Sequence, residues 1–98
     1  MKFSLGEIIK ATEAEIIKGN DEGLNFSFST DTRTIKNGYI YIPLKGESFD
    51  GENFIENAVK SGAHGYFTTD RSKIFEEAKV ILYLKDTKEA YLRLANHY

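Results

Sequence analysis

The fold of this chain is decided between Ser29 and Gly51, where the sequence reads STDTRTIKNGYIYIPLKGESFDG. The stretch begins at the end of a strand, passes through a polar turn, enters an apolar strand and leaves it by a second polar turn. The small and polar side chains that could meet a ligand are concentrated in these turns. We therefore expect a strand–turn–strand–turn unit whose two turns carry any binding site.

The flanking patterns define the two strands. Apolar and polar side chains alternate over residues 24–29, which is typical of a half-buried strand. Asn37 and Gly38 form a strong turn signal, and residues 39–44 read as a more fully buried strand. Pro43 has no N–H to donate, so this strand should end near it or lie at an edge of the sheet.

Capping signals place the first and last helices. Residues 4–7 form a capping box at the start of a helix expected over residues 4–12. Residues 14–18 could continue this helix or form a short strand, since β-branched residues are followed by a glycine-rich turn. Residues 86–89 form a second capping box. The helix after it should bury a stripe of Tyr91, Leu94, Ala95 and Tyr98.

The middle of the chain alternates between helix and strand patterns. Asp50 is the expected N-cap of a helix that ends at Gly62. Its apolar stripe consists of Phe54, Ile55, Ala58 and Val59. Strands are expected over residues 65–69 and, buried on both faces, over residues 80–84. One or two helical turns are expected between them, over residues 71–78.

This order of elements predicts the α/β class, with a small mixed, partly parallel sheet of about four to five strands flanked by helices. The 98 residues suit one domain. The last apolar stripe runs to Tyr98 without a stop signal, so we expect the chain to end inside a helix, at the edge of a domain.

Composition disfavours several classes of protein. The net charge is −2 and the pI is about 5.7, which argues against a surface for nucleic acids or anionic membranes. The absence of cysteine excludes disulfides and cysteine metal sites. The sequence shows neither a signal peptide nor an apolar span. We expect a cytoplasmic protein with no nucleic-acid partner and no membrane insertion.

Few residues suggest catalysis. The sequence has no glycine-rich phosphate loop ending in Lys-Ser/Thr and no nucleophile–base–acid set, which argues against a self-contained hydrolase. His64 and His97 are isolated, so a surface or packed position is favoured over a catalytic or metal-binding one. No catalytic residue and no metal ligand is predicted. The tyrosines in the strand patterns are interpreted as packing residues rather than a platform for bases.

The two polar turns are different. Asp31 can brace the first turn, while Thr32 offers a hydroxyl and Arg33 a fork of N–H donors suited to phosphate or carboxylate. Residues 45–51 should lead into a helix N-terminus, which favours a nearby anion by about 0.3–1 kcal/mol. Both turns follow strands and could face one crevice. Both could equally be ordinary capped turns, and the residues alone do not name a ligand.

Several motifs follow one another in a fixed order: D-T-R at 31–33, G at 38, L-K-G-E at 44–47, F-D-G at 49–51, F at 54 and G-A at 62–63. In order, spacing and residue type they closely resemble the N-terminal domain of the Mur ligases, and the resemblance covers essentially the whole chain. The chain departs from the family pattern at Glu52 and Asn53, where the family has His-Asp. Asn37, Tyr39 and Pro43 also depart from it.

The resemblance implies a domain that binds the UDP part of a UDP-MurNAc-peptide in peptidoglycan synthesis. In the family, a central domain binds ATP and Mg²⁺, and a C-terminal domain binds the incoming amino acid or dipeptide. These two domains would be the partners of residues 1–98, in which no cofactor is expected. The family reaction passes through an acyl phosphate that the amine then attacks.

The resemblance also assigns residues by motif. The implied contacts to UDP are Thr32, Gly46, Glu47, Ser48 and Phe49. The residues implied to support the two turns are Asp31, Arg33, Asp50 and Gly51.

Alternatives remain at this point. The two ends of the chain resemble the family member that joins D-alanyl-D-alanine to the UDP-MurNAc-tripeptide, and the member that adds the third peptide residue is the alternative. Residues 1–98 alone are expected to be inactive, because the ATP-binding domain is not among them. A stand-alone α/β interaction module is the alternative from another class.

Overall fold

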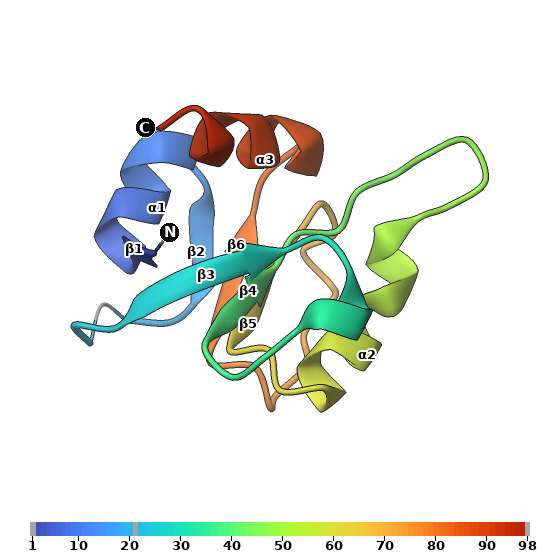
Figure 1. Cartoon of the computed structure of the whole chain (residues 1–98), viewed down its shortest axis with the longest axis horizontal. Helices are drawn as coiled ribbons and strands as arrows, with labels where there is room; N and C mark the ends of the chain where they lie inside the picture. The colour runs from blue at the N-terminus through green and yellow to red at the C-terminus, as the bar shows by residue number, and fades with distance from the viewer. Residues whose placement is uncertain (1, 21, 98) are drawn as a thin grey trace.

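A six-stranded sheet forms the centre of the structure, a computed structural model that describes residues 2–20 and 22–97 (Figure 1). The strand order is β1-β3-β4-β5-β6-β2. The four central strands run parallel: β3 (Asn25–Ser29), β4 (Tyr39–Tyr41), β5 (Gly65–Thr68) and β6 (Val80–Tyr83). The two edge strands run antiparallel to their neighbours: β1 (Phe3–Ser4) and β2 (Glu15–Lys18). The expected partly parallel α/β sheet is confirmed, with six strands instead of about four to five.

The central strands are buried on both faces because successive side chains alternate between two cores. Ile40 and Ile42 lie in one core, while Tyr41 between them lies in the other. In the same way, Val80 and Leu82 belong to the first core and Ile81 to the second. An uninterrupted apolar run is therefore what a central parallel strand requires.

Helices cover both faces of the sheet, as Figure 1 shows. The first core is covered by α1 (Leu5–Thr12) and α3 (Thr87–Ala95), and the second by α2 (Ile55–Lys60). The capping box of α1 is confirmed, since Ser4 N–H donates to Glu7 Oε1 at 2.8 Å and Glu7 N–H donates to Ser4 Oγ at 3.2 Å. Gly62 follows α2 with φ +107°, as expected of a residue just past a helix end. None of the helices in the described residues is long and apolar enough to cross a membrane.

The last helix differs from its prediction. Asp86 caps it by accepting from Lys88 and Glu89 N–H groups, but the Glu89 carboxylate binds Arg93 at 2.6 Å instead of completing a capping box. The buried residues of α3 are Thr87, Ala90 and Leu94. Tyr91 and Ala95, which were expected to be buried, are exposed. The helix ends at Ala95, so the expectation that the chain ends inside it is wrong, and Tyr98 lies outside the described residues.

Two other segments differ from expectation, and a third decides between two alternatives. Residues 71–78 form turns rather than helix, because the Tyr66 hydroxyl donates to Lys73 C=O at 2.5 Å and accepts from Phe75 N–H at 3.1 Å. Residues 14–18, for which helix and strand were both open, contain a strand, β2. The strand expected over residues 39–44 ends at Tyr41, and Pro43 follows this strand end as predicted.

Candidate functional site

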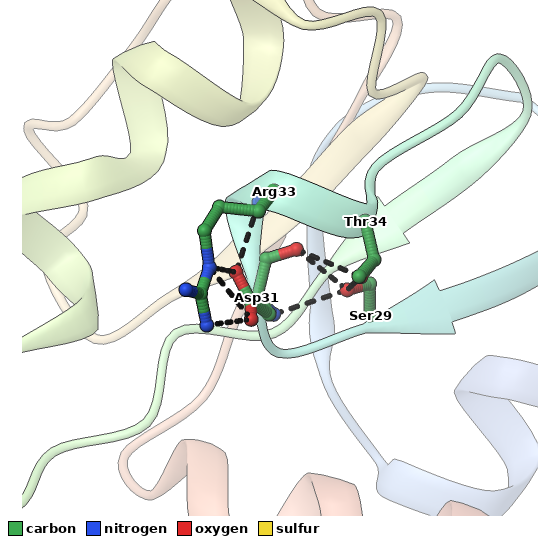
Figure 2. Close-up of polar contacts among 4 residues, drawn as sticks. All are labelled: Ser29, Asp31, Arg33 and Thr34. Carbon is green, nitrogen blue, oxygen red and sulfur yellow. Dashed lines mark hydrogen bonds and ion pairs between the residues drawn. The ribbon is translucent and has the colours of Figure 1, made fainter.

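The first polar turn is closed by its own hydrogen bonds (Figure 2). The buried Ser29 Oγ accepts from Asp31 N–H at 3.0 Å, donates to Asp31 C=O at 2.8 Å and lies 2.7 Å from Thr34 Oγ1. Thr34 Oγ1 also donates to Asp31 C=O at 3.0 Å. The chain then forms the single 3₁₀ turn η1 (Thr32–Thr34). Residues 29–34, called here the Ser29–Thr34 turn, are thus held from within.

Asp31 and Arg33 complete this turn. Asp31 Oδ1 accepts from Arg33 N–H at 2.9 Å, and the Arg33 Nε–H and Nη2–H groups both donate to the same carboxylate. These hydrogen bonds hold the pKa of Asp31 at about 2, well below its usual range. The guanidinium fork that could hold an external anion is therefore engaged by Asp31.

The second polar turn is a short hairpin that projects from the body of the molecule (Figure 1, green loop). Lys45 and Asp50 face each other across it, and Gly46 N–H donates to Phe49 C=O at 2.7 Å. Glu47 and Ser48 are exposed at its tip. We call residues 45–50 the 45–50 hairpin.

The base of this hairpin is tightly packed. Gly51 is buried, its N–H donates to Leu44 C=O at 2.8 Å, and its own C=O accepts from the Tyr41 hydroxyl at 3.0 Å. A Cβ on Gly51 would lie 2.7 Å from Leu44 N, so no larger residue fits without backbone movement. Burial, with the nearby negative charge of Glu52, raises the pKa of Tyr41 to about 12, which keeps its hydroxyl protonated as a donor.

The start of the following helix carries its own carboxylate. Asp50 Oδ1 accepts from Glu52 N–H at 3.0 Å and caps the 3₁₀ segment η2 (Gly51–Phe54), which precedes α2. Glu52, which stands where the family has histidine, accepts from Thr68 Oγ1 at 2.6 Å and from Thr69 N–H at 2.9 Å. The anion position that the sequence suggested at this helix start is thus filled by Asp50.

A hollow of about 500 Å³ brings the two turns together. It is lined by Thr30, Asp31, Thr32, Arg33, Tyr41, Phe49, Phe54 and Asn57. The expectation that both turns face one crevice is confirmed for Phe49 and the D-T-R motif. Gly46, Glu47, Ser48, Asp50 and Gly51 belong to the hairpin and its base rather than to this lining.

Sequence reasoning missed part of the lining. Phe54 was assigned to the core stripe of α2, yet it is 37% exposed and stacks on Phe49 with ring centroids 5.2 Å apart and planes 13° apart. We call these two rings the Phe49–Phe54 pair. Asn57 lies one helical turn after Phe54, and that i, i+3 spacing was the available signal. Tyr41 was correctly interpreted as a packing residue, but its hydroxyl also supports the hairpin base.

His64 is partly buried and His97 is exposed, and both contact an aromatic ring, in keeping with their interpretation as surface or packed residues. The His64 ring lies 4.9 Å from the Phe26 ring, and burial lowers the pKa of His64. The His97 ring lies 5.4 Å from the Phe3 ring. Across residues 2–20 and 22–97, no group of three or more His, Cys, Asp or Glu side chains is placed to hold a metal ion.

Curated relatives of the chain are peptidoglycan ligases. It is 31% identical over 91 residues to the UDP-N-acetylmuramoyl-tripeptide–D-alanyl-D-alanine ligase of Bacillus subtilis, a match covering 87% of this chain and 20% of the relative. It is 30% identical over 94 residues to the UDP-N-acetylmuramoyl-L-alanyl-D-glutamate–2,6-diaminopimelate ligase of Clostridium perfringens, covering 96% of this chain and 19% of the relative. The chain thus spans about a fifth of the length of these proteins.

Solved structures of similar fold come from the same group of enzymes. The UDP-N-acetylmuramoylalanyl-D-glutamyl-2,6-diaminopimelate–D-alanyl-D-alanyl ligase of Acinetobacter baumannii superposes with a TM-score of 0.83 at 25% identity, covering 96% of this chain and 21% of that protein. The MurF ligase of Thermotoga maritima, solved with ADP, shares the fold with a TM-score of 0.60 at 23% identity, over 71% of this chain and 16% of that one. The family model described as "Mur ligase family, catalytic domain" matches residues 27–98. The chain therefore belongs to the Mur ligase family.

Proposed function

We propose that the chain is the N-terminal, substrate-binding domain of a UDP-N-acetylmuramoyl-tripeptide–D-alanyl-D-alanine ligase (MurF). In this proposal it holds the uridine diphosphate of UDP-MurNAc-tripeptide while the rest of the ligase forms the peptide bond. The observation that carries the proposal is the hollow between the Ser29–Thr34 turn and the 45–50 hairpin, because it joins the two family motifs in one concave site.

The proposed contacts divide into two groups. Thr32 supplies a hydroxyl to the nucleotide from the fixed turn, and Phe49 supplies an aromatic face from the hairpin. The exposed tip of the hairpin folds over the diphosphate, with contacts from Gly46, Glu47 and Ser48. Asp31, Arg33, Asp50 and Gly51 hold the two turns in place through the hydrogen bonds within them.

The phosphoryl group for the acyl phosphate would come from Mg²⁺-bound ATP. Residues 1–98 do not fit this group, because the sequence has no phosphate loop and the described carboxylates do not gather into a metal site. We therefore assign ATP and Mg²⁺ to other domains of a longer, cytoplasmic bacterial ligase, and we propose that residues 1–98 alone do not catalyse ligation.

A second candidate is the same domain in the ligase that adds the third peptide residue (MurE-type). The match to the Clostridium perfringens 2,6-diaminopimelate ligase favours it, because it covers 96% of this chain against 87% for the Bacillus subtilis relative. The solved structures named MurF favour the first candidate. The substrates of both ligases carry uridine diphosphate, so the proposed site is the same in both.

Titration of the ¹⁵N-labelled chain with UDP, followed by amide shifts, tests the site. Weak binding is expected, with a dissociation constant on the order of millimolar or about −4 kcal/mol, because one domain alone encloses the ligand incompletely. The shifts should cluster at residues 30–33 and 46–52. If the amides of residues 30–33 and 46–52 did not shift at UDP concentrations several times the expected dissociation constant, the proposal would be contradicted. A stand-alone interaction module would then be favoured.

Thr32→Ala gives the matched variant. It should weaken UDP binding about threefold to tenfold, since it removes one hydroxyl contact, and leave the fold intact. Thr69→Ala, an exposed threonine outside the hollow, is the control and should bind UDP as the unmodified chain does. Unfolding of the Thr32→Ala chain would instead give Thr32 a structural role.

A further inference from the structure

Among the described residues that line the hollow, Asn57 carries the single carboxamide group. It lies on α2, and its helix neighbours Ile55, Ala58 and Val59 are buried in the second core, which fixes the position of its backbone. Its own C=O accepts from Ser61 N–H at 2.9 Å. Its side-chain amide makes no hydrogen bond to the rest of the described chain, so it is available to a ligand.

The rings beside Asn57 offer a surface for a flat ligand. Phe49 and Phe54 are 49% and 37% exposed, unusually accessible for two aromatic rings in contact. A base of any identity gains affinity by extending such a stack, so the rings alone cannot select one base. Selection needs a polar group at the edge of the stack. The other hydroxyl groups of the lining belong to Thr30 and Thr32, in the Ser29–Thr34 turn, and to Tyr41, whose hydroxyl donates to Gly51 C=O.

We propose that Asn57 reads the hydrogen-bonding edge of a pyrimidine base stacked on the Phe49–Phe54 pair. The inference rests on the proposed function and deepens it by naming the residue that recognises the base. A carboxamide presents N–H donors and a C=O acceptor side by side, which matches the adjacent O4 and N3–H of uracil. With cytosine the same pairing requires the amide to be turned over, because N4–H₂ donates and N3 accepts.

Asn57→Asp separates base reading from a merely structural role. A carboxylate has acceptors only. In uracil the single edge donor, N3–H, is flanked by the O2 and O4 carbonyl oxygens, which repel a carboxylate, whereas N4–H₂ of cytosine has a hydrogen on the C5 side that a carboxylate can accept without facing N3. UDP should bind the variant about tenfold more weakly, while CDP should keep most of its affinity. The ratio of the two dissociation constants, measured by NMR titration of the 98-residue chain, should therefore change about tenfold in favour of CDP.

Asn53→Asp is the matched control. Asn53 is exposed, precedes Asn57 by four residues and lies outside the lining of the hollow, so this variant adds the same charge without altering the site. It should leave the UDP-to-CDP ratio unchanged. An equal loss of affinity for both nucleotides in both variants would mean simple repulsion of the diphosphate and would overturn the inference.

The remaining outcomes are also decisive. If the unmodified chain binds UDP but Asn57→Asp leaves the ratio of the UDP and CDP dissociation constants unchanged, the role of Asn57 is overturned. The proposed function then stays intact. No binding of UDP by the unmodified chain overturns both. If Asn57→Asp fails to fold, Asn57→Ala replaces it; it should weaken UDP about fivefold by loss of the edge hydrogen bonds, and undiminished affinity would refute the inference.

Discussion

The Ser29–Thr34 turn and the 45–50 hairpin border the same hollow but are built in opposite ways. In the turn, the buried Ser29 hydroxyl and the Asp31 carboxylate bind neighbouring groups, and each contact lies within a few residues of the next. The hairpin is closed at its base by Gly51, while Glu47 and Ser48 are exposed at its tip. One wall of the hollow is thus preorganised, and we expect the other to adjust to a ligand.

The largest expected effect comes from filling the base of the hairpin. A methyl group at Gly51 would lie 2.7 Å from Leu44 N and 2.8 Å from Pro43 Cα, which are backbone atoms that cannot rotate away. Gly51→Ala should therefore lower the free energy of unfolding by about 3 kcal/mol, at the upper end of the usual cost of overpacking. Urea unfolding followed by circular dichroism measures the change.

Gly46→Ala is the control for this prediction. A Cβ at Gly46 would have no heavy atom within 4 Å, and its φ does not require glycine. Its effect on stability should stay within about 0.5 kcal/mol. If Gly51→Ala were as stable as Gly46→Ala, the hairpin would be adjustable down to its base as well as at its tip.

A smaller effect is expected from removing one hydroxyl in each wall. Ser29→Ala leaves the Asp31 N–H without its acceptor in a partly buried position and should cost about 2 kcal/mol of unfolding free energy. Ser48→Ala removes an exposed hydroxyl and should change stability by less than about 0.5 kcal/mol. If both variants lost the same unfolding free energy in urea, the turn would be no more tightly held by its hydroxyl group than the hairpin is.

The sequence predicted elements best where neighbouring residues decide them. The capping box at Ser4 needs only Glu7, and the end of α2 needs only a residue that tolerates the positive φ of Gly62. Prediction failed over residues 71–78, because the Tyr66 hydroxyl binds backbone groups there that a helix would have used. β1 could not be predicted, since a strand of two residues exists only through its pairing with β3.

The candidate site was predictable to a similar extent. Residue types marked both turns, and the rule that parallel strands present their carboxyl ends at one edge predicted that the turns would meet. Phe54 was misassigned because its spacing fits the buried stripe of α2. Its stacking with Phe49 depends on the hairpin returning Phe49 to its side, and no local pattern encodes that contact.

The smallest expected effect tests whether the Arg33 side chain belongs to the preorganised wall. Arg33→Gln removes the guanidinium, so the pKa of Asp31 should rise from about 2 toward the usual value of 3.8. Because the folded-state pKa is depressed, the stabilisation by Asp31 is present above about pH 4 and is lost as the pH falls toward 2. In the Arg33→Gln variant, ionised Asp31 should stabilise the fold less above about pH 4, so less stability should be lost as the pH falls toward 2.

Carboxyl ¹³C shifts across the acid range would follow Asp31 in both proteins. Asp70 serves as the internal control, since its pKa is lowered by hydrogen bonds from Ser72 and should not respond to Arg33→Gln. An Asp31 titration that is the same in both proteins would assign its low pKa to the Arg33 backbone N–H alone. The guanidinium would then not be needed by the turn, and the preorganised wall would itself hold a cation available to the diphosphate.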